Sequence, residues 1–228
     1  MSLRGKIAIV TGGTGALGSA IVQRFLDEGI MIVASVTKGQ KSPSAGLTYL
    51  GADVTNEADV KALFAECWKR HGRTDILVNT VGGYLPSKPL QEISVEEWDR
   101  MMGINLKSAF LCTREALRAM KDQPYGRVVN ISAMVGLRPT PGRIPYAVSK
   151  SGVSLLNEVV ARELKVSGIT VNAIAPGTLD TESNREWVSQ EDLRRLVPLK
   201  SIADMICFLC SPEAQFVSGT TLRASGGM

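Results

Sequence analysis

The chain has 228 residues, of which 44% are hydrophobic, and this is enough apolar material for one well-buried domain. The formal net charge is +4 without a basic tract, so nucleic-acid binding is not indicated. No apolar run reaches the length of a membrane-spanning helix, and Met1 to Arg4 leave no room for a signal peptide before the first strand. We therefore expect a cytoplasmic protein that does not bind a membrane.

Strand-like and helix-like apolar patterns alternate along the whole chain. The patterns predict strands near 6–11, 31–36, 47–51, 75–80, 126–132, 169–174 and 219–224. They predict helices near 16–28, 57–71, 94–121, 145–167 and 201–211, with a shorter one around 184–195. Such alternation is typical of βαβ units. We predict an α/β fold with a single doubly wound parallel sheet of about seven strands, flanked by helices on both faces, in one domain spanning residues 1–228.

A glycine-rich turn follows the first predicted strand and opens the first helix. Gly13, Gly15 and Gly18 satisfy the G-x-G-x-x-G pattern in this strand–turn–helix context. Glycines let backbone N–H groups approach a diphosphate at the amino end of a helix. The pattern predicts a Rossmann-type dinucleotide site; a glycine-rich turn without a ligand is the alternative. The residues expected to contact the cofactor are Gly12, Gly13, Thr14, Gly15, Ala16, Leu17 and Gly18.

Tyr146 and Lys150 are four residues apart at the start of a predicted long helix. This spacing places a phenol and an ammonium group on one helical face. A cation within about 4–6 Å lowers the pKa of a tyrosine, which predicts a proton donor and acceptor for carbonyl chemistry. An accidental surface pair is the alternative for this spacing alone.

The cysteines and the one histidine do not suggest a metal site. Cys207 and Cys210 have the spacing of half a zinc site, but no second pair or nearby histidine completes it. We predict that they pack in the core of a reduced protein. His71 is next to Gly72 and is interpreted as a helix-end residue.

These motifs together resemble the short-chain dehydrogenase/reductase family over essentially the whole chain. Beyond the glycine turn, Asp53 and Val54 resemble the adenine contact, and Asn105 resembles the asparagine of the catalytic tetrad, with Tyr146 and Lys150 as its tyrosine and lysine. The remaining cofactor contacts that the resemblance implies are Asn79, Thr80, Gly82, Pro176, Gly177, Leu179 and Thr181.

The resemblance implies an NAD(P)-dependent oxidoreductase acting on a small-molecule carbonyl or alcohol. Tyr146 would exchange the proton, Lys150 would lower the tyrosine pKa, and Asn105 would hold a water linking Lys150 to solvent. The alternative for Asn105 is a structural amide that bridges a helix kink to the backbone. A homodimer or homotetramer is also implied. The residues between Thr181 and Pro198 are interpreted as a mobile lid over the substrate.

The end of the second strand bears on the choice of cofactor. An acidic residue there would bind the 2′-hydroxyl of NAD and repel the phosphate of NADP. The chain has no acidic residue at this point, and Ser35, Thr37 and Lys38 could receive a 2′-phosphate. We therefore favour NADP over NAD; a solvated loop lysine is the alternative for Lys38.

Two positions depart from the family pattern. Ala16 stands where the family usually has a glycine, and Ala133 stands where it has the tetrad serine. The neighbouring Ser132 is a candidate replacement, although adjacent strand residues face opposite ways. A buried hydroxyl bonded to the backbone is its alternative.

Two segments near these positions, residues 139–146 and 178–185, resemble dihydropteridine reductase, a branch that works without the serine. That likeness extends the expected substrates to quinonoid C=N compounds. Two other functions remain open, which are a catalytically weak dinucleotide-binding sensor or assembly subunit, and an epimerase or dehydratase on the same scaffold. The expected substrate mouth is lined by Gly83, Tyr84, Met134, Arg138, Arg143, Arg185 and Trp187.

Overall fold

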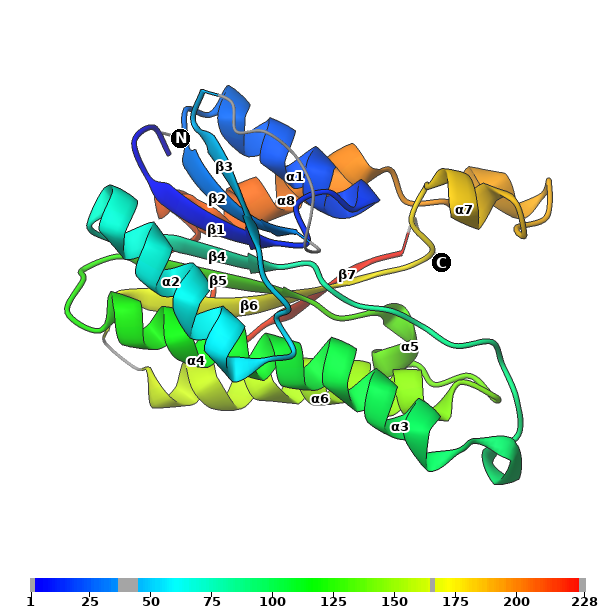
Figure 1. The fold of residues 1–228 in the computed structure, drawn as a ribbon. Coiled ribbons are helices and arrows are strands. Elements are labelled where there is room, and N and C mark those ends of the chain that lie inside the picture. Colours follow the sequence, from blue (N-terminus) through cyan, green and yellow to red (C-terminus); the bar gives the residue numbers. More distant parts are fainter. Residues whose placement is uncertain (1–2, 37–44, 165–166, 226–228) are drawn as a thin grey trace.

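A computed structural model describes residues 3–36, 45–164 and 167–225 of the chain. Its seven strands form the single parallel sheet that the sequence predicts, and their order is β3-β2-β1-β4-β5-β6-β7 (Figure 1). The strands are β1 (Ile7–Thr11), β2 (Met31–Val36), β3 (Leu47–Gly51), β4 (Ile76–Asn79), β5 (Gly126–Ile131), β6 (Ile169–Pro176) and β7 (Thr221–Ala224).

Helices cover both faces of this sheet. The helices are α1 (Ala16–Asp27), α2 (Glu57–His71), α3 (Val95–Met101), α4 (Ser108–Met120), α5 (Met134–Leu137), α6 (Ile144–Glu163), α7 (Glu182–Arg185) and α8 (Leu199–Cys210). Single 3-10 turns occupy Leu90–Glu92, Asp192–Arg195 and Pro212–Ala214. α1 and α8 pack on one face of the sheet, and α2, α4 and α6 pack on the other (Figure 1).

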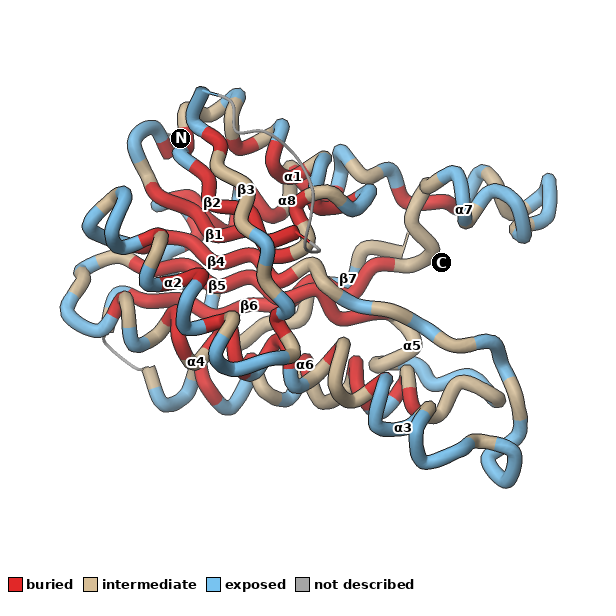
Figure 2. The backbone as a smooth tube through the Cα atoms, in the orientation of Figure 1, coloured by how far each residue is buried: buried red, intermediate tan, exposed pale blue. Residues whose placement is uncertain are grey.

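The central strands are buried because both faces of the sheet are covered, whereas the edge strands β3 and β7 are largely half-buried. All five residues of β1 and all eight of β6 are buried, and Figure 2 shows the central strands as the core of the molecule. Apolar side chains of α1, such as Ile21 and Phe25, join the core layer on one face. Val60, Leu111 and Val160 join the layer on the other. This double burial explains the continuous apolar runs of the sequence.

Two predicted helices are wrong in detail. Residues 94–121 form α3 and α4 joined by a π-helical segment, Met102–Lys107, and not one regular helix. Residues 184–195 contain only the end of α7 and a 3-10 turn. In the first case the π-helical segment contains Asn105, whose side chain bonds to a loop elsewhere in the chain. Sequence periodicity cannot reveal such a partner.

The sheet also explains the burial of the cysteines. Cys67, Cys112, Cys207 and Cys210 are buried and unbridged, which agrees with the predicted packing role. α2 ends at His71 and is capped by Gly72 with a φ of 70°, as the sequence predicts. In the described parts of the chain, no helix is long and apolar enough to cross a bilayer.

Candidate active site

The strand order of the sheet changes direction between β1 and β4. These two strands pair in parallel, with Thr11 opposite Asn79 at their ends. The strand that follows β1 in the chain, β2, lies on one side of this pair, and the strand that follows β4, β5, lies on the other, so the connections that leave β1 and β4 diverge. In open parallel sheets, ligands bind at such a switch point. The glycine turn after β1 and the segment after β4 therefore flank the expected dinucleotide site.

The glycine turn is shaped by close backbone approach. A Cβ atom on Gly18 would lie 2.1 Å from the carbonyl oxygen of Gly12, and one on Gly13 would lie 2.6 Å from the Ala34 side chain. Gly12 itself has a φ of 66°. Only glycine fits these conditions without displacing backbone or core atoms.

The amino end of α1 can receive an anion. Gly15 and Ala16 are exposed there, and no side chain caps the first turn of the helix. Thr14 is partly exposed, whereas Leu17 is buried in the core. Uncapped N–H groups at a helix start fit a diphosphate, so these residues fit the phosphate part of a dinucleotide.

Ser35 does not lie where a 2′-phosphate contact requires it. Its exposed fraction is 1%, and its hydroxyl accepts a hydrogen bond from the Gly12 amide at 3.1 Å. Its carbonyl oxygen accepts from the Gly13 amide at 3.0 Å. Ser35 therefore supports the glycine turn from within, which corrects its predicted phosphate contact. Thr37 and Lys38 lie outside the described residues.

The segment after β4 is tied to the end of β1. The Thr80 amide donates to Thr11 Oγ1 at 3.0 Å, and the Thr80 hydroxyl donates to the Thr11 carbonyl oxygen. Asn79 Nδ2 donates to Asn130 Oδ1 at 2.7 Å in a buried network. Thr11 was not among the predicted site residues, because a threonine at a strand end carries no distinguishing signal.

Asn105 lies in the π-helical segment and holds the next part of this loop. Its Nδ2 donates to the Gly83 carbonyl oxygen at 2.9 Å, and its Oδ1 accepts from the Gly83 amide at 3.1 Å. This is the bridging role that the sequence left as the alternative. A Cβ atom on Gly82 would lie 2.8 Å from Asn105 Oδ1 and 3.2 Å from Lys150 Nζ. The structure thus brings Gly82, Asn105 and Lys150 together.

Lys150 and Tyr146 lie on α6, beside this loop. Lys150 is buried, and its Nζ donates to the carbonyl oxygen of Ile131 at the end of β5, at 2.7 Å. Tyr146 is partly buried and meets the ring of Tyr84 edge to face, with 6.4 Å between the ring centroids. The pair therefore lies at the carboxyl edge of the sheet, beside the loop that follows β4.

The electrostatics of this pair differ from the expectation. Burial raises the pKa of the Tyr146 phenol above its ordinary value, and the positive charge of Arg143 opposes that rise. Burial also lowers the pKa of Lys150 to about 8. The predicted net lowering of the Tyr146 pKa is therefore wrong for the protein alone, because burial has the largest effect on this phenol.

Ser132 faces the body of α6 and not the phenol. Its hydroxyl donates to the Lys150 carbonyl oxygen at 2.9 Å and lies 2.8 Å from Ser154 Oγ. This is the buried, backbone-bonded arrangement that was the alternative for Ser132. Ala133, the next residue, precedes α5 as its N-cap and presents only a methyl group. No serine hydroxyl is therefore placed beside Tyr146 by this strand end.

The chain after β6 is held to the body of the protein by backbone hydrogen bonds at the start of the expected lid. The Gly177 amide donates to Ala224 at 2.8 Å, and Leu179 forms a parallel bridge with Val197. Thr181 Oγ1 accepts from the Asn184 amide and caps α7. Pro176 ends β6 in the core of the sheet. Trp187, beyond α7, has an exposed fraction of 52%, so its side chain does not anchor this segment to the body of the protein.

Asp53 and Val54 follow β3 near the adenine side of the expected site. Asp53 Oδ1 accepts hydrogen bonds from the amide and the hydroxyl of Thr55 at 2.9 and 2.7 Å. Val54 is buried against the core. The backbone of this turn is thus held in one conformation by its own side chains.

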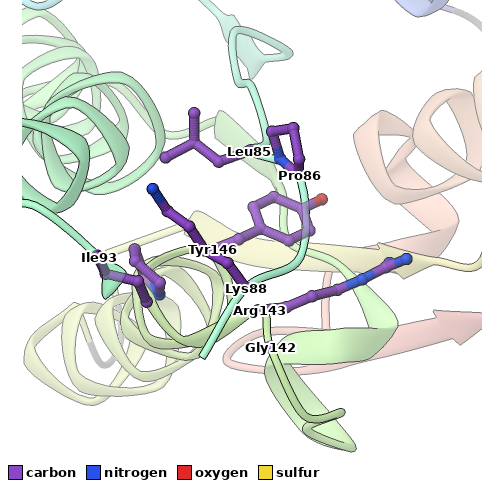
Figure 3. A pocket seen from close by; sticks show the side chains of 8 residues that line it. Leu85, Pro86, Lys88, Ile93, Gly142, Arg143 and Tyr146 are labelled. Atoms are coloured by element: carbon purple, nitrogen blue, oxygen red, sulfur yellow. The ribbon is translucent and has the colours of Figure 1, made fainter. Parts of the chain in front are cut away.

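A small cavity of about 10 Å³ lies directly beside Tyr146 (Figure 3). Its lining residues are Leu85, Pro86, Lys88, Ile93, Gly142, Arg143, Pro145 and Tyr146. A larger groove of about 600 Å³ is lined by Lys6, Asp75 and Tyr125, which precede β1, β4 and β5. Since that groove lies at the amino edge of the sheet, it is remote from Tyr146.

Comparison with known proteins identifies the family. The model of the short chain dehydrogenase family matches residues 6–192. The chain belongs to the short-chain dehydrogenase/reductase family. It is therefore an oxidoreductase by family, with the parallel sheet and glycine turn at the positions that the sequence predicts.

The relatives are similar over their whole length. The 3-oxoacyl-[acyl-carrier-protein] reductase FabG of Vibrio cholerae is 33% identical over 243 residues, covering 100% of this chain and 99% of the relative. Glucose 1-dehydrogenase 2 of Bacillus subtilis is 34% identical over 247 residues, covering 99% and 95%. The solved structure of ElxO with NADP bound superposes with a TM-score of 0.92 at 27% identity, covering 97% of this chain and 98% of that one.

Proposed function

We propose that the protein is an NADP-dependent reductase of carbonyl or quinonoid C=N substrates in which Tyr146 supplies the proton. The observation that carries this proposal is the meeting of Gly82, Asn105 and Lys150 at the carboxyl edge of the sheet, with Tyr146 one turn before Lys150 on α6 and in contact with Tyr84 of the same loop. Relatives named as a 3-oxoacyl reductase and as a glucose dehydrogenase support carbonyl/alcohol chemistry. A neighbour with NADP bound supports the cofactor.

The protein would hold the dinucleotide through residues already described. Gly12 to Gly18 would receive the diphosphate at the start of α1, Asp53 and Val54 would face the adenine, and Pro176 to Thr181 would face the nicotinamide. When bound, the nicotinamide would supply the hydride. Because α1 begins without a side-chain cap, its free N–H groups favour the negative charge of the phosphates.

Tyr146 would give its proton to the substrate oxygen or nitrogen as negative charge develops there. The phenol is protonated at neutral pH, as a tyrosine ordinarily is, so it can act as the proton donor in the direction of reduction. Asn105 would keep the loop carrying Tyr84 in place through its two hydrogen bonds to Gly83. Ser132 would hold the backbone of α6 at Lys150 and would not contact the substrate.

The role of Tyr146 is tested by Tyr146→Phe. A general acid contributes about 10²–10⁴ in rate, so turnover with NADPH should fall by at least about 10² while NADPH affinity changes little. The measurements are steady-state NADPH oxidation over a panel of ketones, quinonoid dihydropterin and 3-oxoacyl thioesters, and a fluorescence titration of NADPH. Turnover that is unchanged in the variant would remove Tyr146 from the mechanism. NADPH binding by a wild type that oxidises none of the panel would favour the sensor alternative.

The choice of cofactor is tested separately. No acidic residue stands at the end of β2, so kcat/KM with NADPH should exceed that with NADH by about tenfold or more. Both constants are measured with the same substrate at one ionic strength, since phosphate recognition is sensitive to salt. A tenfold advantage for NADH would reverse the assignment.

A further inference from the structure

The guanidinium of Arg143 is a cation without an acidic partner at the edge of the Tyr146 cavity. In the described part of the chain, no carboxylate forms an ion pair with it, whereas Arg185 pairs with Asp180 and Arg118 pairs with Glu115. One hydrogen bond is found for its side chain, from Nε to Ser87 Oγ at 3.3 Å. A guanidinium carries five N–H donors, so the two terminal nitrogens retain their capacity for a ligand.

The turn that carries Arg143 is fastened to the opposite wall of the cavity. The Lys88 amide donates to the Gly142 carbonyl oxygen at 3.0 Å. Gly142 has a φ of 78°, and a Cβ atom there would lie 3.1 Å from the Ser87 side chain. Arg143 then forms the N-cap of α6. The base of the side chain is thus held in place, which lowers the ordering cost of binding a ligand.

Arg143 and Tyr146 line the same cavity. In Figure 3 the phenol and the guanidinium extend in the same direction, away from Ile93. The charge of Arg143 is also felt at the phenol, where it opposes the effect of burial on the pKa. A substrate whose reacting oxygen meets Tyr146 would therefore present its nearby atoms to Arg143.

The alanine at position 133 gives a reason for the substrate to bind Arg143. A methyl group stands where the family has a serine, so this position cannot donate a hydrogen bond to the substrate oxygen. Orientation of the substrate must then come from contacts elsewhere. A planar guanidinium orients a carboxylate well because it can donate two parallel hydrogen bonds.

We propose that Arg143 forms an anion-binding subsite and that the substrate is an oxo acid, with its carboxylate one or two carbons from the carbonyl that is reduced. This inference rests on the proposed reductase function, and it names the substrate class for the same site. Lys88 lines the cavity too, but its ammonium is already paired with Glu97 at 2.6 Å. Arg143 is therefore the residue that distinguishes an acid from a neutral ketone.

The binding test uses oxamate, an unreactive analogue of a short oxo acid, titrated into the NADPH-saturated protein with NADPH fluorescence as the readout. Arg143→Gln should weaken oxamate binding about tenfold or more, and Arg143→Lys should retain part of the affinity. Arg162→Gln is the matched control, because Arg162 is exposed in the last turn of α6, the helix that Arg143 begins, and lies outside the cavity lining. Equal oxamate affinity in the wild type and Arg143→Gln, or no binding to the wild type, would overturn the proposal.

The kinetic test compares acids with their methyl esters. Pyruvate and acetoacetate should have kcat/KM values about tenfold or more above those of methyl pyruvate and methyl acetoacetate. Arg143→Gln should abolish this preference, and its kcat/KM values for the two esters should stay within about threefold of those of the wild type. A wild-type preference for the esters, or equal losses for acid and ester, would refute the subsite. Reduction of neither pair would count against the proposed reductase activity, whereas the oxamate titration decides the subsite independently.

Discussion

Single buried groups set the chemistry of this site. Lys150 is a cation enclosed at the end of β5, with the Ile131 carbonyl as its hydrogen-bond acceptor. Its charge is retained at neutral pH, but burial makes that charge costly and lowers the pKa from 10.5 to about 8. The enclosed ammonium therefore reduces the stability of the fold and places a positive charge beside the loop that follows β4.

The cost of that charge has a defined pH dependence. Because the folded-state pKa lies below the unfolded value, the penalty is fully present below about pH 8 and disappears as the pH rises toward 10.5. The unfolding free energy of the wild type should thus gain about 3 kcal/mol relative to Lys150→Met across this window. Denaturant unfolding of both proteins at several pH values measures this difference. Because both proteins contain the same buried thiols, the effect of thiol ionisation on the unfolding free energy cancels in the difference. A difference that does not change with pH would contradict the burial of a charged Lys150.

At the scale of elements, the turn between β1 and α1 has room for a side chain at Gly15 but not at Gly18. A Cβ atom on Gly18 would collide with backbone, 2.1 Å from the Gly12 oxygen, whereas one on Gly15 would lie 3.4 Å from the same atom. Gly18→Ala should lower the unfolding free energy by about 1–3 kcal/mol and weaken NADPH binding, since the turn must open. Gly15→Ala is the control and should cost less than about 1 kcal/mol. Thermal unfolding and NADPH titration of both variants test this, and equal effects would show that the turn is not closely packed.

At the scale of the whole molecule, α4 and α6 leave an apolar surface uncovered. Phe110 on α4 and Val148, Leu155 and Val159 on α6 have exposed fractions between 43% and 60%. The three α6 residues follow a helical stripe. Such a surface is typical of an interface, and we propose that it pairs two copies of the chain.

This pairing is tested by light scattering after size exclusion. The wild type should have at least twice the monomer mass of 24.5 kDa. Leu155→Lys should shift it toward the monomer, because a charge at the centre of an apolar interface is desolvated without a partner. Lys200→Glu on α8 is an exposed control that should leave the mass unchanged. A wild type that elutes as a monomer would contradict the proposal.

The sequence alone determined the alternation of strands and helices, the glycine turn and the Tyr146–Lys150 pair. These features are local, because strand and helix periods and glycine conformations depend on neighbouring residues. The sequence does not decide which apolar residues of α6 face the core: the fold buries Val153 and Val160 and leaves Leu155 and Val159 exposed.

Tertiary structure decided everything that depends on contacts between distant residues. It broke the helix predicted over 94–121 at Asn105, whose partner Gly83 lies 22 residues away. It turned Ser132 toward α6, and it buried Ser35 under the glycine turn. It also placed Arg143 near Tyr146, where its positive charge opposes the rise in the Tyr146 pKa. Such outcomes follow from packing across the sheet, where burial and hydrogen-bond partners are set by segments that no local pattern links.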